Sequence, residues 1–146
     1  MRLTCLLLAF TMLIGCATPV ANSGISDLTN LGVQQFEDEF DVFRVPSSGA
    51  IADATFITLS KGSPSAMSEQ LAQVLASAEA EEVKIVIGGP NSSKTRVVID
   101  GALTLLEGQK LTHLQLMFVG ADDDAEAVGP AVSSAGGRFY SASQQQ

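Results

Sequence analysis

The residues best suited to acid–base or metal chemistry are three consecutive aspartates, Asp122, Asp123 and Asp124, and the only histidine, His113. The aspartates closely follow an apolar run at residues 111–119, which predicts a strand. Acids at the carboxyl ends of strands in α/β folds often bind metal or assist catalysis. Three acids in the first turn of a helix also simply favour the helix dipole, and His113 falls in register with the residues of the predicted strand. Because nothing else completes a ligand set, the sequence predicts structural roles here, with no metal and no cofactor.

A second candidate is the segment at residues 88–95, Gly-Gly-Pro-Asn-Ser-Ser-Lys-Thr, between a predicted strand and a predicted helix. Its spacing resembles the phosphate-binding pattern G-x-x-x-x-G-K-[ST], whose backbone N–H groups cradle phosphate. Ser93 replaces the second glycine, which allows the backbone of that pattern to bend. The sequence therefore favours a turn followed by a helix cap at Ser92 or Ser93. Binding of some anion at this helix N-terminus stays open as an alternative.

The first fifteen residues combine a basic start with a short apolar stretch. Arg2 precedes an apolar run at residues 3–15 that only two threonines and Cys5 interrupt. A helix that crosses a bilayer needs about 20 apolar residues, so this run is too short to span one. A charged start, a short apolar segment and small residues at its end predict a secretory signal peptide at residues 1–15.

Leu13, Ile14, Gly15 and Cys16 end that segment with an aliphatic residue, a tolerant position, a small residue and a cysteine. This order resembles the lipobox of bacterial lipoproteins. The resemblance implies transfer of diacylglycerol to the Cys16 sulfur, cleavage after Gly15, and often acylation of the new amino group by a fatty acid such as palmitate. Ala17 stands where enteric lipoproteins retained in the inner membrane carry aspartate. The resemblance therefore implies a location on the periplasmic leaflet of the outer membrane.

The domain boundaries follow from this resemblance and from composition. Cys5 leaves with the signal peptide and Cys16 is lipidated, so the mature chain has no disulfide and no cysteine metal ligand. Residues 16–30 contain several Ser, Asn, Gly and Pro residues and predict a lipidated N-terminus followed by a flexible tether. We expect a single globular domain at residues 31–142 and a polar tail at residues 143–146.

The charge balance excludes several kinds of partner. The 146 residues include 16 acids and 8 lysines or arginines, a formal charge of −8. Removal of Arg2 with the signal peptide would make that −9. Nucleic acids and anionic lipid surfaces are bound by clustered Lys and Arg, which this chain lacks. The chain has one tyrosine and no tryptophan, so we also expect no aromatic platform on which bases or sugars could stack. We therefore expect no nucleic-acid partner.

Phe36, Phe40 and Phe43 recur at the spacing of one helix face within an acidic segment. The end of the segment, residues 41–45, is equally compatible with a strand. We expect the three rings to pack on the domain itself, with docking onto a partner as the alternative. The intervening acids lack the ligand spacing of a calcium loop.

The remaining pattern predicts alternating strands and helices. Strands are expected at residues 52–60, 83–87, 111–119 and 137–141, and helices at residues 65–81 and 92–107 and from residue 122, the last interrupted at Gly129-Pro130. This β-α-β-α-β-α-β order predicts a small three-layer α/β domain with a mostly parallel sheet and right-handed crossovers. The alternative is an α+β sandwich in which the β-branched residues 94–100 form a hairpin strand.

Two functions from different classes remain. The chain has no G-x-S-x-G elbow, no C-x-x-C and no H-E-x-x-H pattern. We therefore expect a non-catalytic interaction or accessory subunit of an envelope assembly, held in the membrane by lipid on Cys16 and bound to an envelope protein. The alternative is an anion- or metal-binding protein or an enzyme that uses the loops at residues 88–95 and 120–124. That alternative requires the two loops to lie side by side across a pocket.

Overall fold

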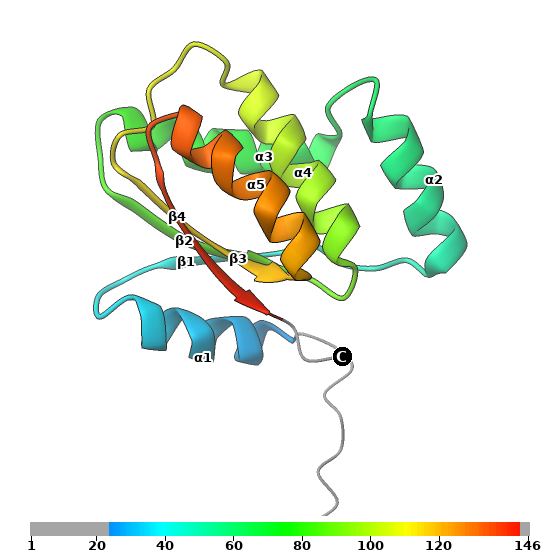
Figure 1. Cartoon of the computed structure of the whole chain (residues 1–146), viewed down its shortest axis with the longest axis horizontal. Helices are drawn as coiled ribbons and strands as arrows, with labels where there is room; N and C mark the ends of the chain where they lie inside the picture. The colour runs from blue at the N-terminus through cyan, green and yellow to red at the C-terminus, as the bar shows by residue number, and fades with distance from the viewer. Residues whose placement is uncertain (1–23, 144–146) are drawn as a thin grey trace, which may run out of the picture.

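The computed structural model describes residues 24–143 and contains a four-stranded, all-parallel sheet in the order β1-β2-β3-β4 (Figure 1). The strands are β1 (Asp41–Arg44), β2 (Val83–Gly88), β3 (Leu114–Gly120) and β4 (Arg138–Ser143). The helices are α1 (Ile25–Gln35), α2 (Ala50–Ser60), α3 (Ala66–Ala76), α4 (Ser92–Leu105) and α5 (Asp122–Ser134), with a short 3₁₀ turn, η1 (Ser77–Glu79), after α3. The predicted α/β class with a parallel sheet is confirmed.

The sheet lies between two layers of helices. Right-handed crossovers between strands that are neighbours in sequence place every connecting helix on the same face. Figure 1 accordingly shows α3, α4 and α5 together above the sheet and α1 alone below it, while α2 lies to one side against α4. Because the crossovers leave the lower face of the sheet uncovered, the helix that precedes β1 must cover it.

Each face of the sheet has its own apolar core. The larger core joins the sheet to α3, α4 and α5 through fully buried residues that include Leu71, Ile99 and Phe118. The smaller core joins α1 to the other face, where Leu28 packs near Val86 and Val119. Residues of β2 and β3 are buried on both sides, which explains their nearly continuous apolar sequences.

The alternative α+β sandwich is wrong, because residues 94–100 lie inside α4 rather than in a strand. Val98 and Ile99 are β-branched, yet they fall on one side of this helix and are completely buried in the larger core. The helix is also capped by the side chain of Asn91, which accepts a hydrogen bond from the backbone N–H of Lys94 at 3.0 Å. Burial and capping together outweigh the local preference for a strand. The expected cap at Ser92 or Ser93 is therefore displaced to Asn91.

The strand expected at residues 52–60 is also wrong, since this segment forms α2. The alternation of polar and apolar residues around Thr55 and Phe56 suggested a strand. In the structure, however, the strand that pairs with the outer edge of β2 is β1. In the helix, the hydroxyls of Thr55 and Thr58 donate to the carbonyls of Ile51 and Ala54 at 2.9 Å each. Such bonds to the preceding turn let threonine remain in a helix.

The N-terminal part of the described chain differs from expectation as well. A helix through Phe36, Phe40 and Phe43, which their spacing suggested, does not form, because α1 ends at Gln35. The alternative of a strand at residues 41–45 is confirmed, since residues 41–44 form β1. The flexible tether expected at residues 16–30 is too long, since α1 already begins at Ile25. The apolar residues of α1 cover the lower face of the sheet. The locally polar sequence around them gives no sign of this tertiary contact.

The remaining elements agree with the sequence apart from their ends. Ser65 caps α3 as expected, accepting from the N–H of Ser68 at 3.1 Å. The helix from Asp122 continues through Pro130 to Ser134 instead of breaking there. The last strand runs to Ser143, so the polar tail begins one residue later than expected. No helix in residues 24–143 is long and apolar enough to span a bilayer.

Candidate functional site

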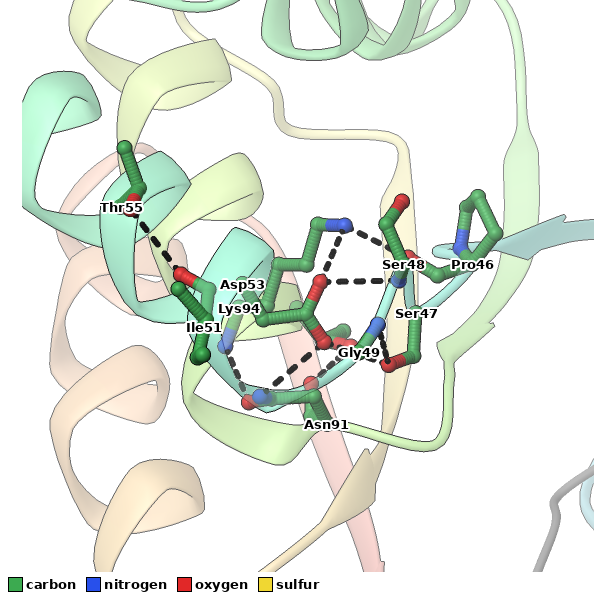
Figure 2. Close-up of polar contacts among 10 residues, drawn as sticks. Pro46, Ser47, Ser48, Gly49, Ile51, Asp53, Thr55, Asn91 and Lys94 are labelled. Carbon is green, nitrogen blue, oxygen red and sulfur yellow. Dashed lines mark hydrogen bonds and ion pairs between the residues drawn. The ribbon is translucent and has the colours of Figure 1, made fainter.

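The most connected polar group in the described chain is Asp53, in the first turn of α2. Its Oδ1 accepts from Nζ of Lys94 at 2.8 Å and from the backbone N–H of Ser48 at 3.0 Å. Its Oδ2 accepts from Oγ of Ser47 at 2.6 Å and from Nδ2 of Asn91 at 3.3 Å. Figure 2 shows these groups gathered around the carboxylate, with Pro46, Ser47 and Ser48 of the β1–α2 loop to the right of Lys94. The carboxylate is thus enclosed by donors from three segments.

These donors fix the charge of the buried carboxylate. The hydrogen bond from Lys94 holds the pKa of Asp53 well below its usual range, and the bonds from Ser47 and Ser48 act in the same direction. Burial opposes them, because a charged group loses hydration when it leaves water. The Asp53 side chain is only 1% exposed and that of Lys94 only 5%. The pair is therefore a buried, hydrogen-bonded ion pair.

The position of Lys94 argues against a phosphate-binding loop. Its Nζ also donates to the carbonyl oxygen of Pro46 at 2.7 Å and lies 4.9 Å from the centre of the Phe56 ring. An ammonium can donate three hydrogen bonds and can accept none. In a phosphate loop the lysine reaches the phosphates, whereas here Lys94 is directed into the contact between α2 and α4. Its role in this structure is to hold α2.

The glycines of the same segment have a structural explanation. A Cβ on Gly89 would lie 2.0 Å from the carbonyl oxygen of Val45, a distance that no side chain can occupy. A Cβ on Gly88 would lie 2.6 Å from the Leu28 side chain. The glycines therefore permit the close approach of α1 and of the end of β1, which is enough to account for them without a ligand.

The two loops of the alternative hypothesis do lie side by side. Oγ of Ser92 accepts from the backbone N–H of Ala121 at 2.8 Å, and Oγ of Ser93 donates to Asp124 at 3.2 Å. These bonds join the N-terminal ends of α4 and α5 directly. An anion here would meet the carboxylate of Asp124, and two donors that could bind it, the backbone N–H of Ala121 and the hydroxyl of Ser93, are already used.

Two of the three aspartates at this edge, Asp122 and Asp124, are likewise bonded. Arg96 lies between two carboxylates, 3.4 Å from Asp100 and 3.7 Å from Asp124. Burial raises the pKa of Asp100, and the charge of Arg96 opposes that rise. The hydroxyl of Ser143 donates to Asp122. Within residues 24–143, no group of three or more His, Cys, Asp or Glu side chains is arranged to hold a metal ion.

His113 is not the half-buried strand residue that the sequence suggested. It is exposed in the turn before β3, where its Nδ1 lies 3.3 Å from the hydroxyl oxygen of Thr112. The strand begins only at Leu114, because the backbone of residues 112–113 forms the turn that enters it. His113 is thus at the opposite end of β3 from Asp122, Asp123 and Asp124, and the histidine and these acids do not form a catalytic set.

The expectation that the three phenylalanines pack on the domain is confirmed, although not on one face. Phe36 is buried and packs with Phe40 in the smaller core, at a ring-centre distance of 5.9 Å. Phe43 contacts the larger core on the opposite face of the sheet. Alternate residues of a strand point to opposite faces, which separates Phe43 in β1 from the other two. Cys16 and the lipobox lie outside the described residues.

A different surface stands out, on the side of α2 that faces away from Asp53. It is uncharged, and its two largest side chains, Ile51 and Leu59, are 85% and 71% exposed. We call it the α2 outer face, and its residues are Ala50, Ile51, Ala54, Thr55, Thr58 and Leu59. Large exposed apolar side chains gathered on one element often mark an interaction site.

Sequence reasoning missed both Asp53 and the α2 outer face. One available signal was that Asp53 is the only charged residue between Arg44 and Lys61. A single charge in a long uncharged segment is a candidate for a buried pair, since buried charges require a partner. The identity of that partner, 41 residues away, could not be inferred from local spacing.

Comparisons with known proteins add no relative. No family model, no curated protein and no solved structure shows significant similarity to the chain.

Proposed function

We propose that this protein is a membrane-anchored periplasmic lipoprotein that serves as a non-catalytic interaction subunit of an envelope assembly. Lipid on Cys16 would hold it, on the periplasmic leaflet of the outer membrane, and an envelope protein would be its partner. The anchor is supported by the lipobox pattern at Leu13 to Cys16.

The observation that supports a non-catalytic role is that the candidate polar groups bond to one another within the domain. Lys94 and Asp53 neutralise each other inside the domain, and Ser92 and Ser93 bind the backbone and side chain of the neighbouring loop. A catalytic group must reach a substrate with a proton, a lone pair or a charge to offer. Asp53, Lys94 and the hydroxyl of Ser93 are already bonded within the fold, and this supports an interaction role over an enzymatic one.

The ligand-binding alternative keeps one supporting observation, the contact between the loops at residues 88–95 and 120–124. The same hydrogen bonds weaken it, because they use two donors that could bind an anion, the backbone N–H of Ala121 and the hydroxyl of Ser93. A metal ion would compete with Arg96 for Asp124. We therefore place this alternative second.

The anchor is tested by expressing the full chain in bacteria and measuring the intact mass of the protein extracted from membranes. We expect a chain that begins at Cys16 and carries the added mass of two or three acyl chains. Cys16→Ser should abolish the added mass and release the protein from the membrane fraction. Cys5→Ser is the matched control, since it makes the same change in the segment to be removed and should leave the mature mass unaltered.

The interaction role is tested by cross-linking the lipidated protein in cells and identifying what is captured with it. One dominant envelope protein at near-equal stoichiometry, weakened by Cys16→Ser, would support the proposal. Recovery of the protein alone would count against it. Screening phosphate and divalent cations by thermal shift would then decide on the second candidate.

A further inference from the structure

The α2 outer face is suited to burial in an apolar environment. Asp53 is the only charged residue of α2, and it is turned inward with 1% exposure. Thr55 and Thr58 carry the only side-chain hydroxyls of the face, and both donate to carbonyls of the preceding turn. Figure 2 shows this bond from Thr55 to Ile51. Since these hydroxyls are paired within the helix, an apolar medium could cover the face without stranding a polar group.

The start of the described chain lies at the same end of the sheet as α2. Leu28, in the first turns of α1, lies beside Gly88 at the carboxyl end of β2. Asp53, in the first turn of α2, is bonded to Asn91, just beyond the same strand. Figure 1 shows the first turn of α1 beneath the carboxyl ends of β3 and β4, and α2 farther out on that same side.

Chain length limits how far this end can be from the proposed anchor. The segment from Cys16 to Gly24 can extend by at most roughly 30 Å, since an extended chain spans about 3.3–3.6 Å per residue. A lipid on Cys16 would therefore hold the carboxyl end of the sheet close to the bilayer. At such proximity even a weak contact is populated, because tethering makes the second binding event intramolecular.

We propose that the α2 outer face lies against the bilayer that holds the Cys16 lipid, with Ile51 and Leu59 in the boundary between headgroups and acyl chains. This inference rests on the proposed lipid anchor and names a second contact with the same membrane.

A bilayer fits this face better than a second copy of the chain. Stable protein interfaces bury about 1,200–2,000 Å² in total, whereas an 11-residue helix is only about 16 Å long. The acidic chain, with a formal charge of −8, would also repel its copy. An uncharged face is where such a domain can approach a lipid surface, and binding should be weaker on anionic lipid than on zwitterionic lipid.

The test places an environment-sensitive fluorophore on a single introduced cysteine in the full lipidated chain, bound to phosphatidylcholine vesicles. Lipidation would use the Cys16 thiol and processing would remove Cys5, so the introduced thiol is the only reactive one. The positions are Ile51→Cys and Leu59→Cys, with Val33→Cys as a control on α1, where the native side chain is 63% exposed. We expect a blue shift, a severalfold rise in emission, and quenching by nitroxide-labelled lipid at positions 51 and 59 but not at 33.

A further variant separates the helix from the fluorophore. Adding Ile51→Glu to the Leu59→Cys protein should return the emission at 59 toward that of water, because a carboxylate opposes entry into lipid. Water-like emission at 51 and 59, equal to that at 33, would overturn the proposal. So would a blue shift that appears only with rising protein concentration or only in native envelope membranes, which would indicate a second copy or a protein partner.

Failure of the anchor and failure of this contact are distinguishable. The intact mass of each labelled protein reports whether Cys16 is acylated. An unmodified Cys16 would reject the proposed lipoprotein, and with it the anchored contact. An acylated Cys16 with water-like emission at 51 and 59 would reject the α2 contact alone.

Discussion

Nζ of Lys94 lies 2.8 Å from Oδ1 of Asp53, and the two residues are 41 positions apart in the chain. The contact joins α4 to α2. Phe56, the one aromatic residue of α2, lies beneath the same ammonium. The pair and the packing of Phe56 against the larger core hold a helix whose remaining surface is largely exposed. The pair therefore sets both the stability of α2 and the presentation of its outer face.

Replacing one member of the pair should destabilise the fold strongly. Lys94→Met leaves the carboxylate of Asp53 buried without its cation, and breaking a buried pair in this way costs about 3–5 kcal/mol. The double variant Asp53→Asn with Lys94→Met removes both charges and should recover part of that loss. Urea unfolding followed by circular dichroism measures each free energy.

Lys84→Met provides the matched control for Lys94→Met. Lys84 pairs at 3.0 Å with Asp38, whose side chain is 78% exposed. Exposed ion pairs contribute about 0–1 kcal/mol, so this variant should lose little stability. Equal losses at positions 84 and 94 would mean that the buried pair has no special role.

The same pair predicts a loss of stability in acid. The pKa of Asp53 is lowered in the folded protein, so the folded state binds a proton less readily than the unfolded chain, where Asp titrates near 3.9. Its stabilisation is complete above that unfolded value and is lost as the pH falls through the folded pKa. The unfolding free energy should therefore decline as the pH falls below about 4.

Urea midpoints measured at a series of pH values test this prediction. The double variant Asp53→Asn with Lys94→Met should show a shallower decline below pH 4, because one linked carboxylate has been removed. Parallel declines in the parent and the double variant would assign the acid sensitivity to other carboxylates.

The covering of the lower sheet face by α1 predicts a contrast within one helix. Leu28 is fully buried, whereas Val33 is 63% exposed. Leu28→Ala should destabilise the domain by about 2–5 kcal/mol through lost burial and a cavity. Val33→Ala should change stability by no more than about 0.5 kcal/mol. Thermal or urea unfolding of the two variants measures the contrast, and a small effect at Leu28 would show that α1 does not contribute to the folded core.

Gly89 offers a test of the structural explanation for the 88–95 segment. Gly89→Ala forces a Cβ toward the carbonyl of Val45 and should cost about 1–3 kcal/mol or more. Gly62→Ala is the control, since the nearest atom to its added Cβ is 3.9 Å away. Unfolding midpoints compare the two, and a neutral Gly89→Ala would indicate that the glycine is present for some reason other than packing.

The sequence predicted the elements that form the centre of the fold. The apolar segments that became β2 and β3 were recognisable because burial on both faces leaves almost no polar position. The stripe of α3, which includes Leu71 and Leu75, was recognisable because only one of its sides is buried. In these segments the local pattern of apolar and polar residues shows which faces are buried.

The misassigned segments depend on contacts distant in sequence. α1 is helical because the lower sheet face needs a cover, and residues 94–100 are helical because Val98 and Ile99 meet the larger core. Asp53 is buried because Lys94 is available on another helix. In the candidate loops, the sequence correctly identified Gly88 to Thr95 as a strand-to-helix turn, but the direction of the Lys94 side chain required the three-dimensional structure.

The strand order β1-β2-β3-β4 also bears on how the chain can assemble in time. Each strand pairs with the one before it, so no strand has to be inserted between two that are already joined. The growing sheet has a single advancing edge, onto which every new helix and strand can dock as they leave the ribosome or an export channel. Only α1 must wait, because the smaller core that it joins also includes Val86 of β2, Met117 of β3 and Tyr140 of β4. Among residues 24–143, the first helix to be synthesised is thus the last to pack in place.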